Sequence, residues 1–151
     1  MSKQTKKQKL ANLVVGNVGM YFAAYQLSLR GWNVMPTSRN ARGIDLLAYD
    51  ADASRFLGIQ IKTLSKKNGA VPLGLHAPDN LLGDWWIIVT NIARITDHEN
   101  PICFVMTPEE VRKGAVRDKG GQQAYWLPWA AYSNVAFRDW NRIGRGDANQ
   151  A

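Results

Sequence analysis

Two strand-like stretches joined by a short polar turn constrain the fold of this chain more than any other part of its sequence. Residues 44–49 and residues 56–63 are mostly apolar, and the six residues between them are Asp, Ala, Asp, Ala, Ser and Arg. This spacing predicts an antiparallel β-hairpin. Side chains two positions apart on a strand point to the same face. Gln60 and Lys62 are therefore expected to share a face, and pairing of the strands is expected to bring Asp45 beside them.

These three side chains have the chemistry needed to cut a phosphodiester bond. The Asp45 carboxylate is an oxygen ligand for a hard divalent cation, and the Lys62 ammonium is a positive charge beside it. The alternative is an ordinary polar strand surface, on which Asp45 and Lys62 form an exposed ion pair worth under about 1 kcal/mol. The pattern of these residues leaves both interpretations open.

A helix is predicted before the hairpin, over residues 9–30, because apolar residues recur there at spacings of three and four. Gly31 follows at the position that favours a left-handed backbone. Gly16 and Gly19 lie inside this helix, where each glycine costs about 1 kcal/mol relative to alanine. We therefore expect these two glycines either to allow close approach of another backbone or to mark a break in the helix.

The remaining pattern predicts an α/β (α+β) fold with a central mixed five-stranded sheet flanked by helices. Residues 65–84 contain several prolines and glycines and give only a short helical turn at 78–82. Thr107 is a predicted N-cap, with a proline next to it and a glutamate three positions later. The other predicted elements are strands at 32–37, 85–91 and 102–106, a short strand at 125–129 and a closing helix at 133–142.

The length of 151 residues is typical of one domain. We expect a disordered basic tail at 1–8, a single domain at 9–143 and a flexible polar tail at 144–151. No uninterrupted apolar run approaches the roughly 20 residues that span a bilayer. The basic start also lacks the apolar segment of a secretory signal. The sequence therefore predicts a cytoplasmic protein without a membrane partner.

The net charge of +7 favours a polyanionic partner such as nucleic acid. Four of these charges come from Lys3, Lys6, Lys7 and Lys9, so the tail is more basic than the body. A solvated tail that only aids solubility would have the same composition. The single Cys103 lies in an apolar run and is expected to be a buried thiol, and one cysteine with two separated histidines argues against zinc.

A helix with paired glycines, a strand that begins with Asp45 and a strand that reads Ile59-Gln60-Ile61-Lys62-Thr63 follow one another in this chain. This order resembles the PD-(D/E)xK nuclease superfamily, the restriction-endonuclease-like fold that includes Holliday-junction resolvases and homing endonucleases. The resemblance covers residues 11–106 and implies an αβββαβ core. It also implies hydrolysis of DNA with Mg²⁺ or Mn²⁺ as the cofactor.

The resemblance assigns roles to particular residues. It makes Asp45, Gln60 and Lys62 the catalytic set. The metal ligands would be the Asp45 carboxylate, the Gln60 carbonyl oxygen and the Ile61 backbone carbonyl, and Lys62 would position or activate the attacking water. Four basic residues on the adjoining loops would contact DNA phosphates, or would serve solubility alone: Arg39, Arg42, Lys66 and Lys67. Four further residues are accessory candidates: Asn17, Met20, Ser38 and Thr63.

Two positions depart from the superfamily pattern. Gln60 stands where most relatives have Glu or Asp, and Met20 stands where relatives often have Glu after the second glycine. A neutral amide binds Mg²⁺ less tightly than a carboxylate does. An alternative is therefore a catalytically weakened or inactive nuclease-fold protein that binds nucleic acid or a protein partner. A structural protein without a nucleic-acid role is a third interpretation, and a homodimer is a further expectation for a nuclease of symmetric targets.

Overall fold

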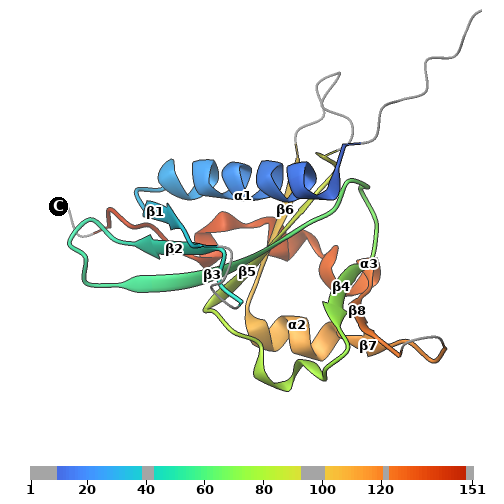
Figure 1. Ribbon diagram of the computed structural model, residues 1–151. Coiled ribbons are helices and arrows are strands. Elements are labelled where there is room, and N and C mark those ends of the chain that lie inside the picture. The colour runs from blue at the N-terminus through green and yellow to red at the C-terminus, as the bar shows by residue number, and fades with distance from the viewer. Residues whose placement is uncertain (1–9, 39–42, 93–100, 121–122, 149–151) are drawn as a thin grey trace, which may run out of the picture.

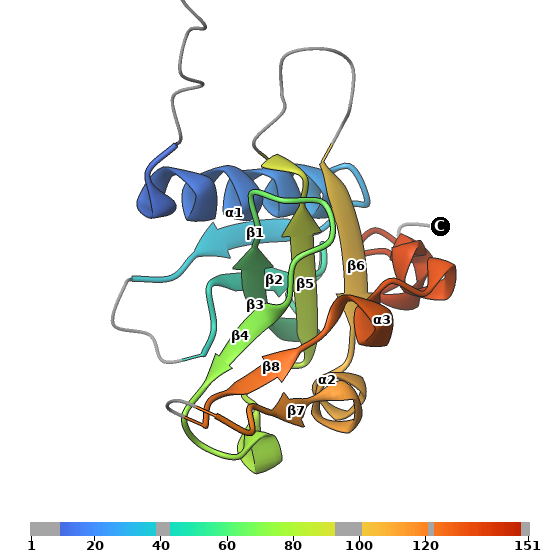
Figure 2. The same cartoon turned by 90° about the vertical axis from the view of Figure 1, so that its right-hand side faces the viewer.

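The computed structural model describes residues 10–38, 43–92, 101–120 and 123–148. A five-stranded sheet forms the centre of the molecule, with one long helix across one face and a smaller three-stranded sheet on the other (Figures 1 and 2). The predicted tail at 1–8 lies outside the described residues, as do Arg39 and Arg42.

The central sheet has the strand order β1-β2-β3-β5-β6. Strands β3 and β5 are parallel and the other neighbours are antiparallel, so the sheet is mixed as predicted. The predicted hairpin forms between β2 and β3, with Leu46 opposite Ile59. The strands are β1 (Asn33–Pro36), β2 (Leu46–Tyr49), β3 (Phe56–Thr63), β5 (Trp85–Thr90) and β6 (Ile102–Met106).

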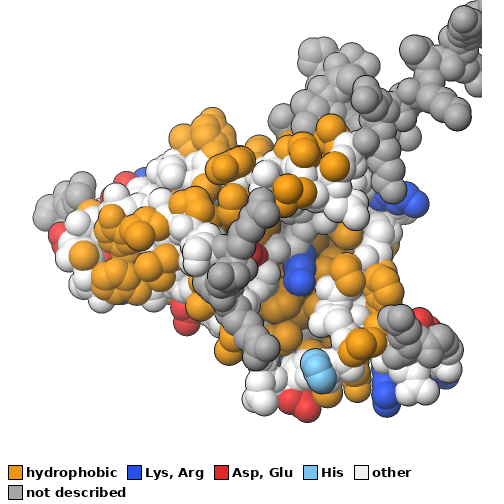
Figure 3. Space-filling view, viewed as in Figure 1, with side chains coloured by type: hydrophobic (Ala, Val, Ile, Leu, Met, Phe, Trp, Pro, Cys, Tyr) orange, Lys and Arg blue, Asp and Glu red, His pale blue; other side chains and the backbone are white. Residues whose placement is uncertain are grey.

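The long helix α1 (Asn12–Ser28) buries one residue per turn against the sheet. Its buried residues are Val15, Gly19, Ala23 and Leu27, at a spacing of four that places them on one face. They pack with apolar side chains of β3 and β5 in one core cluster. The opposite side of α1 is also apolar, and Figure 3 shows hydrophobic side chains along it. The helix is shorter than the predicted 9–30. Because both of its faces carry apolar residues, it is also less amphipathic than predicted.

The two glycines of α1 have different surroundings. A Cβ built on Gly19 would lie 1.9 Å from Oγ1 of Thr63, so this glycine lets the helix approach the end of β3. A Cβ built on Gly16 would meet nothing within 4 Å. The helix continues through both positions. Of the two predicted roles, the helix break is wrong, and the close approach occurs at Gly19 but is to the Thr63 side chain and not to a backbone.

The smaller sheet covers the opposite face with the strand order β4-β8-β7. Val71 and Leu127 from this sheet pack with Trp86 and Ile88 of the central sheet in a second core cluster. The strands are β4 (Val71–Gly74), β8 (Tyr125–Leu127) and β7 (Val116–Arg117). Sequence patterns did not predict β4 or β7. Strand β4 contains a proline and an irregular register, and β7 has only two residues, so neither shows a strand period.

Helical segments complete the fold between and after these strands. The predicted turn is a 3₁₀ helix η1 (Pro78–Asn80) in the connection from β3 to β5. Helix α2 (Pro108–Gly114) begins with the predicted capping box, in which Thr107 and Glu110 bond each other's backbone N–H. Trp129, predicted as the end of a strand, instead begins α3 (Trp129–Tyr132).

The predicted closing helix at 133–142 is wrong. That segment forms two 3₁₀ turns, η3 (Val135–Arg138) and η4 (Trp140–Arg142). The Asn134 side chain accepts a hydrogen bond from the N–H of Ala136, and Asp139 accepts one from Asn141. Each side chain therefore starts a new turn, and the extended backbone of Asp139 interrupts a continuous helix.

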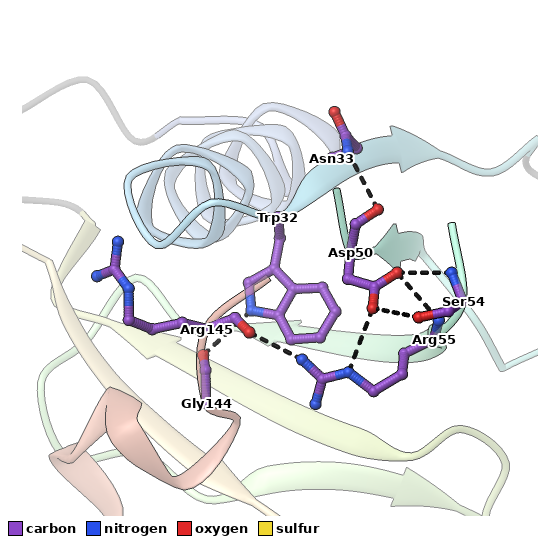
Figure 4. Close-up of polar contacts among 7 residues, drawn as sticks. All are labelled: Trp32, Asn33, Asp50, Ser54, Arg55, Gly144 and Arg145. Atoms are coloured by element: carbon purple, nitrogen blue, oxygen red, sulfur yellow. Dashed lines mark hydrogen bonds and ion pairs between the residues drawn. The ribbon is translucent and has the colours of Figure 1, made fainter. Parts of the chain in front are cut away.

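Residues 144–146 are bonded to distant parts of the chain. The Trp32 indole N–H donates to the Gly144 carbonyl at 3.1 Å, and the Arg55 guanidinium donates to the Arg145 carbonyl at 2.8 Å (Figure 4). Backbone bonds also join Gly146 to Arg30. These contacts extend the packed chain beyond residue 143 and differ from the flexible tail expected from residue 144. The composition is that of a loop, but the bonding partners lie far away in the sequence.

Candidate active site

Asp45 lies in the turn that enters β2, and its carboxylate reaches across to β3. Gly43, with φ of +73°, turns the chain just before it. The Asp45 N–H donates to the Ile59 carbonyl at 2.8 Å, which fixes the backbone against β3. Asp45 Oδ2 then accepts a hydrogen bond of 2.7 Å from the Ile61 N–H. The carboxylate is therefore anchored at one oxygen by the neighbouring strand.

The Gln60 amide meets the same carboxylate oxygen. Its Nε2 donates to Asp45 Oδ2 at 2.6 Å and lies 3.3 Å from the Ile61 carbonyl oxygen. The structure thus brings together the Asp45 carboxylate, the Gln60 amide and the Ile61 carbonyl, which are the groups that the sequence selected as metal ligands. Their placement follows from the register of the β2–β3 hairpin.

Lys62 and Asp45 line one cavity of about 710 Å³ between α1 and the hairpin. Asn17 and Met20 line it from α1, as predicted, and Ile61 and Thr63 line it from β3. Ser38, which is exposed, lies in the wall that follows β1. Within the described part of the chain, Lys62 forms no ion pair within 4.0 Å. The ammonium and the carboxylate therefore share a cavity without closing on each other.

The surroundings of Lys62 change its acidity. Burial lowers the pKa of its ammonium, and the Asp45 carboxylate opposes part of that shift. The Nζ atom also lies 5.7 Å from the centre of the Trp86 ring, a distance within the range of a cation–π contact. A buried lysine with a lowered pKa beside a carboxylate is a frequent feature of functional sites.

Other wall residues were not predicted. The Thr37 hydroxyl bonds the Ile44 carbonyl and lies 3.3 Å from the Asp45 carbonyl, so it braces the turn that carries the carboxylate. Tyr21 lines the cavity from α1 and is 61% exposed. Its position four residues after Asn17 was a usable signal, because residues four apart share a helix face.

Two of the four predicted basic contacts can be placed. Lys66 and Lys67 are exposed just after β3, and the Lys66 carbonyl accepts a hydrogen bond of 3.2 Å from the Asn91 N–H. Neither residue lines the cavity. They therefore lie along the chain that leaves the site, where the expected contact with a polyanion stays a prediction.

The donor set suits a hard cation. Asp45 and Ile61 offer a carboxylate and a backbone carbonyl, which are oxygen ligands of the kind that Mg²⁺ takes together with water. Gln60 carries an amide oxygen of the same kind, but in this structure its amide nitrogen faces these two groups. Among the described residues, no group of three or more His, Cys, Asp or Glu side chains could hold a metal ion. Cys103 is buried as predicted, and burial raises the pKa of its thiol to about 12.

Comparisons with known proteins show likeness in structure but not in sequence. No protein-family model matches the sequence. No curated protein matches it either. The chain is similar to the solved structure of a bacterial homing endonuclease, I-Ssp6803I, over 66% of this chain and 67% of that one, with 16% sequence identity and a TM-score of 0.43. No helix among the described residues is long and apolar enough to cross a membrane.

Proposed function

We propose that this chain is a metal-dependent endonuclease that hydrolyses phosphodiester bonds in DNA. The observation that carries the proposal is the meeting of the Asp45 carboxylate, the Gln60 amide and the Ile61 carbonyl beside a cavity that Lys62 also lines. Oxygen ligands and a partly buried ammonium in one cavity are the means by which a protein binds a phosphate and stabilises the charge of its transition state.

Asp45, Gln60 and Ile61 are the residues that would hold Mg²⁺ or Mn²⁺. When bound, such a cation polarises a phosphate oxygen and lowers the pKa of a coordinated water. Asp45 presents its carboxylate from a backbone that β3 holds in place, so the ligand is preorganised. Gln60 would contribute through its carbonyl oxygen, which makes this a site with one formal negative charge.

Lys62 binds the phosphate in this proposal. Its ammonium reaches the cavity from β3 and places a positive charge where the transferred phosphoryl group becomes more negative. It also orients the water that attacks the phosphorus atom, because an ammonium can donate to a water and to a phosphate oxygen at once. Because its pKa is lowered, the Lys62 ammonium gives up a proton more readily than an exposed lysine does, so Nζ can exchange a proton with that water.

DNA is the proposed partner because the chain is a polycation. The net charge is +7, and Lys66 and Lys67 are exposed at the end of β3. Basic residues beside a phosphate site bind the neighbouring phosphates of a strand and make the affinity dependent on salt. The expectations of a homodimer and of a cytoplasmic location stay predictions.

A second candidate is a protein of the same shape that binds nucleic acid without cutting it. The cavity wall from α1 favours this candidate, since Met20 lines the cavity with a thioether where a carboxylate would add a second negative charge to that of Asp45. The other residues of α1 that line the cavity are also uncharged: Asn12, Leu13, Gly16, Asn17 and Tyr21. This version of the site keeps Lys62 for phosphate binding and holds a cation weakly.

A plasmid assay separates the two candidates. Supercoiled DNA is incubated with the protein and Mg²⁺ or Mn²⁺, and Asp45→Asn and Lys62→Met are compared with two matched controls, Asp52→Asn in the exposed turn and Lys113→Met on α2. Cleavage that disappears in both site variants and persists in both controls supports the endonuclease. Salt-sensitive DNA binding without cleavage supports the second candidate, and the absence of both contradicts each of them.

A further inference from the structure

The side-chain amide of Gln60 is held in one orientation by two acceptors. Its nitrogen lies 2.6 Å from Asp45 Oδ2 and 3.3 Å from the Ile61 carbonyl oxygen. A carboxylate and a backbone carbonyl can only accept hydrogen bonds, while the amide NH₂ group has two hydrogens to donate. The NH₂ end must therefore face both oxygens, and the carbonyl oxygen Oε1 faces away from them.

The amide nitrogen lies between two groups of the proposed cation site. The Asp45 carboxylate and the Ile61 carbonyl are two of the three groups that would ligate Mg²⁺, and the NH₂ group, with its partial positive charge, is bonded to both of them. An amide nitrogen is not a ligand for a hard cation, which takes oxygen donors. Gln60 cannot enter the coordination shell in this orientation.

The geometry points to Gln60 as a rotating ligand whose amide turns over when a cation binds. Without a cation, the NH₂ hydrogens bridge Asp45 and Ile61. With one, the amide rotates by about half a turn about its last torsion, so that Oε1 replaces the nitrogen. The Ile61 N–H keeps its 2.7 Å bond to Asp45, so the carboxylate stays in place while the amide turns. This inference rests on the proposed cation site at Asp45.

The rotation sets the affinity of the site. Binding must break the bond of the amide to the ionised carboxylate, and this loss weakens cation affinity by roughly tenfold to a hundredfold compared with a ligand that needs no turn. A glutamate at position 60 would need no such turn. Without a cation, however, its carboxylate would lie against that of Asp45, and like charges at that distance repel each other. Gln60 therefore keeps the metal-free hairpin stable at the expense of affinity.

Nuclear magnetic resonance of the side-chain amides tests the metal-free arrangement. The Gln60 NH₂ signal, shifted by its bond to a carboxylate, is expected to move when Asp45 is changed to alanine. The Gln26 signal is an internal control, because Gln26 lies near the C-terminal end of α1 and its Oε1 accepts a hydrogen bond of 2.9 Å from Arg30. A Gln60 signal that is unchanged in Asp45→Ala overturns the inference.

Titration with Mg²⁺ alone tests the rotation. The Gln60 NH₂ signal is expected to move in the same direction as in Asp45→Ala, together with the backbone amide signal of Ile61, which reports the carboxylate. Movement of Ile61 without Gln60 overturns the rotation and leaves the cation site of the proposed function in place. If neither signal moves, the inference fails, while the plasmid assay still decides the proposed function.

The variant Gln60→Glu gives an independent readout. We expect Mn²⁺ to bind this variant about tenfold to a hundredfold more tightly than the native chain in a calorimetric titration. We also expect a lower midpoint of thermal unfolding without metal, which Mn²⁺ restores. Equal Mn²⁺ affinities would show that the amide does not weaken cation binding. Equal midpoints in the absence of metal would show that it does not stabilise the metal-free hairpin.

Discussion

Asp45 and Asp50 stand at the two ends of the same strand, β2, and their carboxylates have opposite environments. Asp50 is 2% exposed, and both of its oxygens are bonded (Figure 4). Its Oδ1 accepts from the N–H groups of Ser54 and Arg55 at 2.7 and 3.0 Å, and its Oδ2 accepts from the Ser54 hydroxyl at 2.7 Å and from Arg55 Nε at 3.5 Å. At Asp45, Oδ2 holds two hydrogen bonds while the side chain lines a cavity.

The origin of the donors explains this difference. The donors to Asp50 come from the next five residues, so the turn saturates the carboxylate of its own first residue with hydrogen bonds. That carboxylate is therefore not available to a ligand. The donors to Asp45 come from β3, at least fifteen residues away, and they hold the group at the edge of an open space. A saturated carboxylate stabilises a fold, whereas a partly saturated one in a cavity can bind.

The largest expected difference between substitutions at Asp45 and Asp50 is in the rate of DNA cleavage. Asp45→Asn should lower the rate of DNA cleavage by about 10²–10³-fold, because a ligand charge is lost while the Asn side chain can still accept from Ile61. Asp50→Asn should leave the rate per folded molecule unchanged. The check is a time course of plasmid nicking at equal concentrations of folded protein. Loss of cleavage in Asp50→Asn alone would reverse the assignment of the two residues.

The next effect is on stability and should be found at Asp50. Hydrogen bonds from Arg55 and Ser54 lower the pKa of Asp50 to about 2, below the value of an unfolded chain. Its stabilising contribution is therefore present at neutral pH and is lost as the pH falls from about 5 toward 2. Asp50→Ala should lower the midpoint of thermal unfolding at pH 7 and reduce this dependence on acid.

The matched control for that measurement is Asp52→Ala, in the same turn but exposed. Calorimetric scans between neutral and acidic pH give both quantities. An Asp50→Ala variant that loses stability in acid as steeply as the native chain would show that other carboxyl groups dominate.

A smaller effect on stability is expected in α1, where Gly19 is closely packed and Gly16 is not. Gly19→Ala should destabilise the fold by about 1–3 kcal/mol, because its Cβ would lie 1.9 Å from Thr63 Oγ1. Gly16→Ala should stabilise the helix by up to about 1 kcal/mol, since nothing lies within 4 Å. Urea unfolding of the two variants measures the difference, and equal free energies of unfolding would contradict the close contact of α1 with β3.

The smallest effect concerns Lys62. The Asp45 carboxylate raises the pKa of Lys62 against the larger effect of burial, so Asp45→Asn should lower that pKa further. Asp50→Asn, at the far end of β2, should leave it unchanged. A titration of the Lys62 side-chain signals by nuclear magnetic resonance gives both values. An unchanged pKa of Lys62 in Asp45→Asn would mean that the two charges do not interact across the cavity, and a raised pKa would contradict the attraction between them.

Local patterns predicted the part of the molecule that carries the site. The hairpin follows from two apolar runs and a polar turn, and its register places Asp45, Gln60 and Ile61 together. The capping box of α2 follows from three residues in sequence. These features were predictable because each depends on residues that are close in the chain.

Features that depend on distant partners were not predictable. Strand β4 exists because Val71 pairs with Leu127, and the carbonyls of Gly144 and Arg145 accept hydrogen bonds from Trp32 and Arg55. Within the site, the orientation of the Gln60 amide is set by two acceptors, one of which is the carboxylate across the hairpin. The resemblance made Gln60 a candidate ligand, but only the structure shows which end of its amide faces Asp45.

A crystal soaked in Mn²⁺ tests the cation site most directly. The account predicts an anomalous difference peak about 2.0–2.2 Å from an Asp45 carboxylate oxygen, with the Gln60 Oε1 atom and the Ile61 carbonyl oxygen turned toward the same peak. An ordered Mn²⁺ at another place, or an Asp45 without a peak in a protein that cleaves DNA with Mn²⁺, would contradict it.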